Sequence, residues 1–258
     1  MGCIALLRKE KMSGHSKWST IKRKKGANDA KRGKLFAKLI KAIEVAAKNG
    51  GTDPSANAAL YQAISKAKSN SVPNDNIERA LKRIDGDSDS GEIFELTYEG
   101  YGPHGVAILI NCLTDNKNRT SSDVRATLTK NNGSMGNPGS VAYLFELKAI
   151  FQFEQYDDEL IELAINLNCL DIQESNSGIT LEFEPNNFKS AYEKFKQDGY
   201  NPLNAEIANI PSSSINLDAA QFSQITKLIE SLEDLDDVQD VYANFDIEEK
   251  ELESLLSE

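Results

Sequence analysis

The residues most capable of chemistry in this sequence are cationic side chains crowded near its N-terminus. Lys38, Lys41 and Lys48 recur at spacings that place each of them within about 40° of Lys34 on an α-helix. The apolar residues of the same segment fall on the opposite side of that helix: Leu35, Phe36, Leu39, Ile40, Ile43 and Ala47. The sequence therefore predicts a helix with one cationic face and one core face.

More cations precede this helix, and few anions offset them. They are Lys17, Lys22, Arg23, Lys24, Lys25, Lys31 and Arg32. Between Ser13 and Lys48 only Asp29 and Glu44 are acidic. Such a density of positive charge repels itself unless a polyanion neutralises it, which a phosphate backbone does by releasing counterions.

We interpret this region as a nucleic-acid-binding surface. The candidates are Lys17, Trp18, Lys22, Arg23, Lys24, Lys25, Lys31, Arg32, Lys34, Lys38, Lys41 and Lys48. Trp18 has two readings, because it can stack on a base or pack against the neighbouring helices. If the helix stood alone, a solvated lysine face would be the favoured interpretation.

The net charge of −11 conceals two opposite electrostatic characters. Residues Met1 to Asp85 hold 19 basic and 7 acidic side chains, and the remainder holds 10 basic and 33 acidic ones. Separate modules with separate partners follow from this asymmetry. The excess of acidic residues after Asp85 indicates either that this region binds a protein partner or that it repels stray nucleic acid.

No combination of residues predicts catalysis. His15 and His104 are the only histidines, one in the basic arm and one in a glycine-rich stretch. That stretch, residues 100–105, matches GxGxxG but precedes a predicted strand, so it reads as a hairpin turn and not as a dinucleotide site. We therefore expect no enzyme, no catalytic residue, no metal, no cofactor and no small-molecule substrate.

Other charged groups have structural readings. The run Asp157 to Glu159 lies where a helix begins and favours the helix dipole. Glu233, Asp234, Asp236 and Asp237 are expected to be solvated. A minor basic spot on a later helix has intramolecular ion pairs as its alternative explanation: Arg119, Arg125 and Lys130.

Hydrophobic periodicity predicts helices first and an alternation of strands and helices afterwards. A polar, basic arm over residues 13–33 precedes helices at 34–48 and 54–70 and a third helix that Asn74 or Asp75 caps and Gly86 ends. Strands are expected at 93–98, 106–110, 141–146, 149–154, 169–174, 179–183, 204–210 and 238–245. The later helices are expected at 118–130, where Thr120 and Asp123 have capping-box spacing, and at 157–168, 186–198 and 218–233.

This order predicts a multidomain α+β protein: an N-terminal three-helix domain followed by two α+β domains with antiparallel sheets, one inserted in the other. The predicted boundaries are an extension over 1–12, a basic helical domain over 13–86, a middle domain over 87–135 and 211–246, an inserted acidic domain over 136–210, and an acidic tail over 247–258. No stretch reaches the roughly 18 apolar residues of a membrane span, so no membrane partner is expected. Cys3, Cys112 and Cys169 show no metal or disulfide spacing, which is typical of a reducing compartment and predicts a cytoplasmic location.

Several motifs together resemble the YebC/PmpR family. They are residues 13–18 (SGHSKW), 21–25 (IKRKK), 32–36 (RGKLF), 72–77 (VPNDNI), 98–103 (YEGYGP) and 113–120 (LTDNKNRT). Their order along the chain is more specific than any one of them. The resemblance implies a three-domain protein whose third domain is inserted into the second, and a start at Met12.

The resemblance also implies a nucleic-acid partner. Members of the family are described as cytoplasmic DNA-binding transcriptional regulators, so a DNA-binding regulator of the YebC type is the first expectation. Relatives, including a mitochondrial translational activator, act on the ribosome. A ribosome-associated factor that contacts ribosomal RNA and assists stalled or proline-rich synthesis is therefore the alternative.

Overall fold

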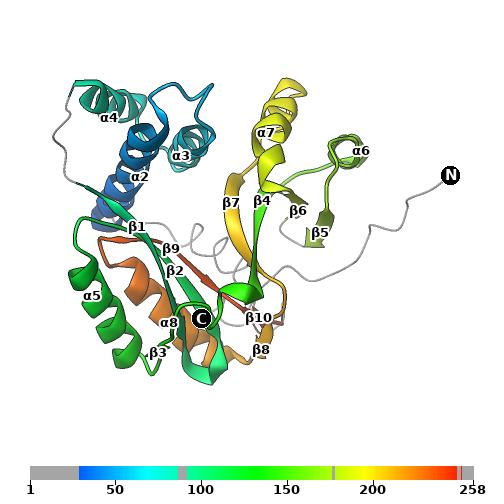
Figure 1. Ribbon diagram of the computed structural model, residues 1–258. Coiled ribbons are helices and arrows are strands. Elements are labelled where there is room, and N and C mark those ends of the chain that lie inside the picture. Colours follow the sequence, from blue (N-terminus) through cyan, green and yellow to red (C-terminus); the bar gives the residue numbers. More distant parts are fainter. Residues whose placement is uncertain (1–28, 87–91, 176–177, 249–250, 252–258) are drawn as a thin grey trace. The chain divides into compact units, whose positions relative to one another are not determined.

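The computed structural model describes residues 29–86, 92–175, 178–248 and 251, which form two compact units (Figure 1). The first unit contains residues 39–86 and 147–209, and the second contains residues 29–38, 92–146 and 210–248. We call residues 147–209 the inserted segment, because they interrupt the second unit along the chain. None of the helices in these described ranges is long and apolar enough to cross a bilayer.

Three helices come first: α2 (Asp29–Gly50), α3 (Ala58–Ser69) and α4 (Asn74–Gly86). Each buries one apolar stripe, represented by Ile43, Leu60 and Ile77. Asn57 caps α3 by accepting a hydrogen bond from the Leu60 backbone N–H at 3.0 Å, and its amide donates to the Ala46 carbonyl at 2.7 Å. This one side chain therefore ends one helix and starts the next.

The inserted segment has the β-α-β-β-α-β order of a ferredoxin-like fold. Its elements are β4 (Phe145–Phe153), α6 (Asp158–Asn166), β5 (Asp171–Ser175), β6 (Gly178–Phe183), the 3-10 turn η3 (Pro185–Asn187), α7 (Phe188–Gln197) and β7 (Asn204–Pro211). The strands lie in the order β5-β6-β4-β7, and β4 pairs antiparallel with β6. Phenylalanines from β4, β6 and α7 fill the core, and Tyr61 of α3 packs against it.

The second unit is built on a four-stranded sheet in the order β3-β1-β2-β9. Its strands are β1 (Phe94–Tyr101), β2 (Ala107–Thr114), β3 (Ser134–Met135) and β9 (Val238–Ala243), with the 3-10 turn η1 (Pro103–Gly105) between β1 and β2. Two helices, α5 (Lys117–Lys130) and α8 (Ala219–Glu233), lie side by side on one face (Figure 1). A small parallel pair, β8 (Ile215–Leu217) with β10 (Phe245–Ile247), completes the unit.

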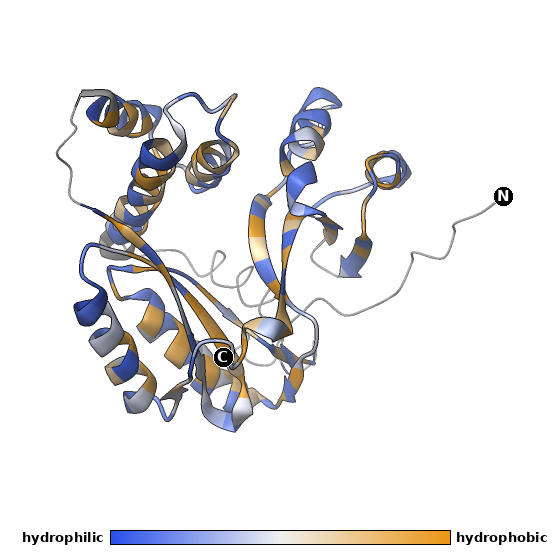
Figure 2. Ribbon diagram, in the orientation of Figure 1, coloured by the Kyte–Doolittle hydropathy of each residue, from blue (hydrophilic) through white to orange (hydrophobic). Residues whose placement is uncertain are grey.

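The core of the second unit lies between these two helices and the sheet. Ile108 and Ile110 of β2 meet Val124 and Leu128 of α5 and Ile225 of α8, all fully buried. Figure 2 shows β2 as mainly hydrophobic. The continuous apolar run of β2 thus belongs to a central strand, as its sequence predicts.

The α+β class with N-terminal helices and antiparallel sheets is confirmed, and several local predictions are wrong. One strand, β4, replaces the two strands expected at 141–146 and 149–154, since residues 142–144 form the 3-10 turn η2. The strands β3, β8 and β10 were not expected as separate elements. Asn116, and not Thr120, caps α5, because its side chain accepts from the Arg119 backbone N–H at 3.1 Å.

The glycine-rich loop after β3 is held by one carboxylate. Glu99 of β1 is 8% exposed and accepts hydrogen bonds from the backbone N–H groups of Gly139, Val141 and Ala142. Burial alone would raise the pKa of Glu99, but these hydrogen bonds outweigh it and lower the pKa.

We expect Glu99→Gln to lower the free energy of unfolding by about 1–2 kcal/mol at pH 7, because an amide has one acceptor oxygen for three donors. A group whose pKa is lower in the folded state stabilises above its unfolded pKa, and this contribution disappears as pH falls through the folded pKa. Urea unfolding at pH 7 and at pH 3 measures the effect. The difference between wild type and variant should shrink at the lower pH, and a constant difference would contradict this account.

Candidate nucleic-acid interface

The cationic face predicted for the first helix lies on α2. Lys34 and Lys48 are exposed, Lys38 and Lys41 are half-buried, and the opposite side is buried at Ile43. The separation of faces is less complete than the helical spacing suggested. Val45 falls angularly among the lysines and is 8% exposed, whereas Leu35 of the predicted core face is 38% exposed.

The arm that precedes α2 lies outside the described residues. The candidates placed there are His15, Lys17, Trp18, Lys22, Arg23, Lys24 and Lys25. Lys31 belongs to α2, but its side chain is also outside the described part. Arg32 is exposed, and its guanidinium carbon lies 5.4 Å from the centre of the Phe36 ring, a cation–π contact that leaves its charge uncompensated by any carboxylate in the described chain.

Two lysines of α2 contact the C-terminal end of α8. Lys34 Nζ donates to the Asp234 carbonyl at 3.3 Å and lies 3.5 Å from Asp236 Oδ1. Lys38 Nζ donates to the Glu233 carbonyl. The last carbonyls of a helix carry partial negative charge, so they attract ammonium groups. No pattern in the sequence indicates these partners, which lie about 200 residues further along the chain.

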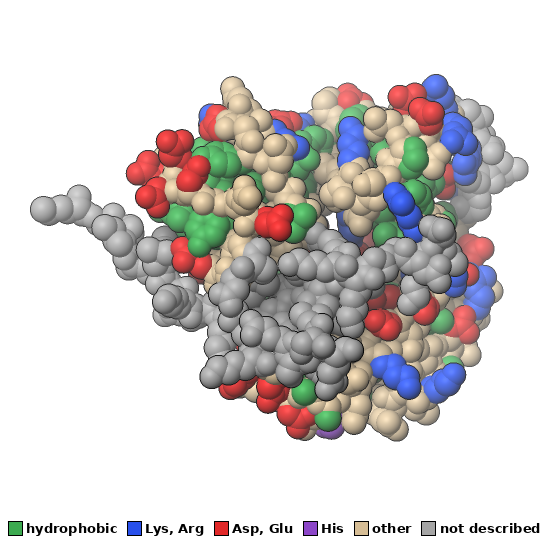
Figure 3. All heavy atoms as spheres, turned by 180° about the vertical axis from the view of Figure 1, so that it is seen from behind, with side chains coloured by type: hydrophobic (Ala, Val, Ile, Leu, Met, Phe, Trp, Pro, Cys, Tyr) green, Lys and Arg blue, Asp and Glu red, His purple; other side chains and the backbone are tan. Residues whose placement is uncertain are grey.

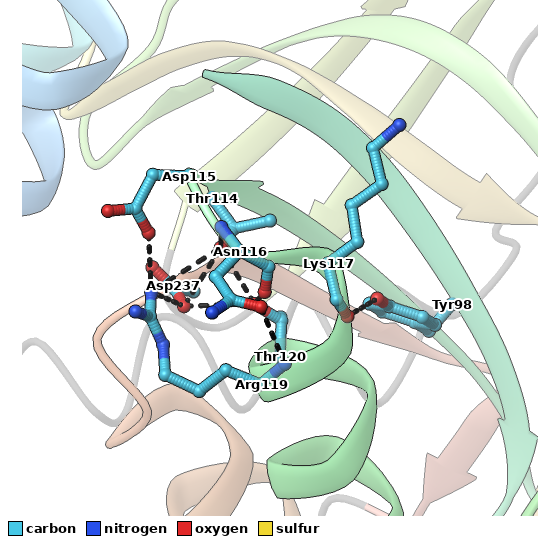
Figure 4. Close-up of polar contacts among 8 residues, drawn as sticks. All are labelled: Tyr98, Thr114, Asp115, Asn116, Lys117, Arg119, Thr120 and Asp237. Carbon is cyan, nitrogen blue, oxygen red and sulfur yellow. Dashed lines mark hydrogen bonds and ion pairs between the residues drawn. The ribbon is translucent and has the colours of Figure 1, made fainter. Parts of the chain in front are cut away.

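Next to this contact, the buried carboxylate of Asp237 gathers donors from the start of α5 (Figure 4). Its Oδ2 lies 2.7 Å from Arg119 Nη2, 2.9 Å from Thr120 Oγ1 and 3.1 Å from Thr114 Oγ1. The Asp237 carbonyl accepts from the Leu113 backbone N–H at 2.8 Å. These bonds join the turn between β2 and α5 to the segment between α8 and β9.

Arg119 is held by two carboxylates. Its Nη2 also lies 2.7 Å from Asp115 Oδ1 (Figure 4). The hydrogen bond to Asp237, followed by that to Asp115, raises the pKa of Arg119, which stays charged. Of the predicted basic spot, Arg119 therefore follows the alternative reading as an intramolecular ion pair. Arg125 and Lys130 are exposed and form no ion pair within the described residues.

The acidic run before β9 is only partly solvated, as the contacts around Asp237 require. Asp236 is exposed, with 85% of its side chain accessible, whereas Asp237 is 9% exposed. The expectation that Asp237 is solvated is therefore wrong. The signal that could have drawn attention here is the motif at 113–120, whose hydroxyls and guanidinium need an acceptor, although nothing in one sequence names that acceptor.

A pocket of about 510 Å³ opens where these groups meet. Its lining residues are Lys34, Arg119, Thr120, Asp123, Asp234, Leu235, Asp236 and Asp237. All of them belong to the second unit. The pocket thus places one lysine of the predicted cationic face beside the guanidinium of Arg119.

The remaining candidate groups have structural roles. Pro103 to Gly105 form the turn between β1 and β2, as predicted, and His104 adopts a left-handed φ of 64° there. Its Nε2 lies 3.0 Å from Gln224 Oε1. In the described ranges no three His, Cys, Asp or Glu side chains are grouped so that they could hold a metal ion.

Comparison with known proteins assigns the chain to a family. Residues 16–87 match the model of the TACO1/YebC protein N-terminal domain, and residues 93–245 match that of the TACO1/YebC second and third domain. The chain belongs to the TACO1/YebC family. The resemblance drawn from the motifs is thereby confirmed.

The relatives of this TACO1/YebC chain align over nearly their whole length. A protein of Geotalea uraniireducens named "probable transcriptional regulatory protein" is 47% identical over 247 residues, which cover 95% of this chain and 100% of the relative. A Borrelia turicatae protein of the same description is 50% identical over 240 residues, 92% of this chain and 98% of its own. A conserved hypothetical protein from Aquifex aeolicus has a similar crystal structure, with a TM-score of 0.76, 40% identity, and coverage of 86% of this chain and 93% of that one.

Proposed function

We propose that this protein regulates gene expression, as a DNA-binding transcriptional regulator of the YebC type, by gripping nucleic-acid phosphates with the cations of α2. The observation that carries the proposal is the helix itself. It presents Arg32, Lys34 and Lys48 as exposed cations, with Lys38 and Lys41 on the same face as the two lysines. The names of the curated relatives support a role in transcription.

Charge elsewhere in the chain supports this choice of surface. The exposed side of α6 carries Asp158, Glu159 and Glu162, and Figure 3 shows acidic side chains grouped over the inserted segment. A phosphate backbone is repelled by such a surface. Nucleic acid is therefore directed to α2 and to the basic arm with Lys17, Trp18 and Lys22 to Lys25, and the acidic segment is left for a protein partner.

The protein makes mainly phosphate contacts on this proposal. Lysine ammonium groups bind phosphates as point charges, and such contacts fix position without reading sequence. Selection of particular sites then requires another component, such as a protein partner bound by the acidic segment.

Crosslinking in living cells, followed by sequencing of the bound nucleic acid, tests the proposal. We expect wild type to enrich a limited set of promoter segments, and Lys34→Gln with Lys48→Gln to lose that enrichment. Both positions are exposed, so their replacement leaves the core of the helix intact. Lys130→Gln with Lys227→Gln removes the same charge from exposed positions on α5 and α8 and serves as the matched control.

Two results would contradict the proposal. Enrichment of ribosomal RNA in place of promoter segments would indicate that the protein acts in translation and not in transcription. Equal recovery of nucleic acid with both double variants would mean that α2 is not the interface.

A further inference from the structure

We propose that the pocket at Lys34 and Arg119 is a phosphodiester subsite, and that Asp236 is its competing intramolecular anion. This inference rests on the proposed function and adds to it one site, one ligand class and one residue that limits affinity. On this account the chain carries a carboxylate in the position that a backbone phosphate must take.

The contact between Lys34 and Asp236 has the geometry of an ammonium–phosphate contact. Asp236 Oδ1 lies 3.5 Å from Lys34 Nζ, a distance at which a phosphate oxygen would also pair with the ammonium group. The same ammonium group donates to the Asp234 carbonyl at 3.3 Å. Lys34 is therefore already surrounded by oxygen acceptors, and a bound phosphate would exchange one of them for another.

The solvent exposure of each acceptor determines which of them a phosphate can displace. The side chains of Lys34 and Asp236 are 55% and 85% exposed. Ion pairs so open to water contribute little to stability, about 0–1 kcal/mol. Asp237, which is buried and accepts from Arg119 and two hydroxyl groups, cannot leave at a comparable cost. Asp236 is thus the displaceable anion of this segment.

Arg119 adds further hydrogen-bond donors at the same pocket. Its side-chain hydrogen bonds to the described residues all use Nη2, and a guanidinium carries five N–H donors in all. Nη1 and Nε make no hydrogen bond to the described residues. Lys34 and Arg119 both line the pocket, so a phosphate that enters it meets an ammonium group and a pre-positioned guanidinium.

Binding of the full-length chain to a duplex DNA oligonucleotide at about 0.15 M salt tests the subsite. We expect Asp236→Asn to tighten binding about two- to fivefold, because it removes the competing anion. Glu230→Gln is the matched control: it removes the same charge from α8 at a half-buried position whose side chain forms no hydrogen bond or ion pair with the described residues, and it should change affinity by less than about 1.5-fold.

Two further variants localise the effect. In a Lys34→Gln background, Asp236→Asn should give no gain beyond that of Glu230→Gln, since the two side chains act on each other. Asp115→Asn releases Arg119 from its more exposed carboxylate and should tighten binding about twofold. If Asp115→Asn gives no gain in affinity, Arg119 does not contribute to the subsite.

The outcomes separate this inference from the proposed function. If wild type binds the oligonucleotide and Lys34→Gln with Lys48→Gln weakens it, but Asp236→Asn behaves like Glu230→Gln, only the subsite is wrong. If wild type shows no salt-dependent binding at all, the proposed function itself fails.

Discussion

Replacing Phe151 with alanine is expected to lower the free energy of unfolding of the first unit by about 3–5 kcal/mol. Phe151 is fully buried at the centre of the inserted segment. Its ring centre lies 5.4 Å from that of Phe188, 5.2 Å from that of Phe195 and 5.5 Å from that of Phe183. Truncation removes all three contacts and leaves a cavity between strand and helix that the sheet cannot close.

Urea unfolding followed by circular dichroism measures this loss. Tyr156→Ala is the matched control, because Tyr156 is an aromatic residue of the same segment that is 39% exposed and forms no aromatic pair in the described chain. It should change stability by less than about 0.5 kcal/mol. A loss below about 1.5 kcal/mol for Phe151→Ala would contradict the packing described here.

Replacing Asp237 with alanine is expected to destabilise the second unit by about 2–3 kcal/mol. The change removes the acceptor shared by Thr114, Thr120 and Arg119 and leaves two buried hydroxyl groups without it. Arg119 is half-exposed and keeps Asp115 as a partner, so most of the loss comes from the hydroxyls.

The neighbouring aspartate supplies the control for this prediction. Asp236→Ala removes an exposed carboxylate and should leave stability within about 0.5 kcal/mol of wild type. Thermal unfolding of both variants measures the contrast. Equal effects at the two positions would mean that the hydrogen bonds to Asp237 contribute nothing.

Much of this fold follows from the periodicity of apolar residues. The stripes through Leu39, Leu60 and Ile77 predicted the three N-terminal helices, and the apolar run of β2 predicted a central strand. Short strands were not predicted, because they form only by pairing with residues that are distant in the sequence. The two residues of β3 are too few to show alternation, and β8 becomes a strand only by pairing with β10, 30 residues later.

The candidate site also has one part that the sequence predicts and one part that it does not. The helical spacing of Lys34 and Lys38 predicted their shared face, because neighbours on a helix are close in sequence. Their partners at the end of α8 could not be predicted, since contacts across about 200 residues leave no pattern in one chain. Asp236 and Asp237 are adjacent and chemically identical in sequence, and only the fold makes one exposed and the other buried.

The central claim is that the cations of α2 neutralise nucleic-acid phosphates, and the salt dependence of binding tests it most directly. The logarithm of the binding constant falls with the logarithm of salt concentration by about 0.9 for each phosphate that is neutralised on duplex DNA. We predict that Lys34→Gln with Lys48→Gln weakens binding and lowers this slope by about 2, whereas Lys130→Gln with Lys227→Gln leaves it unchanged. An unchanged slope in the α2 variant, or an equal fall in both, would contradict the claim.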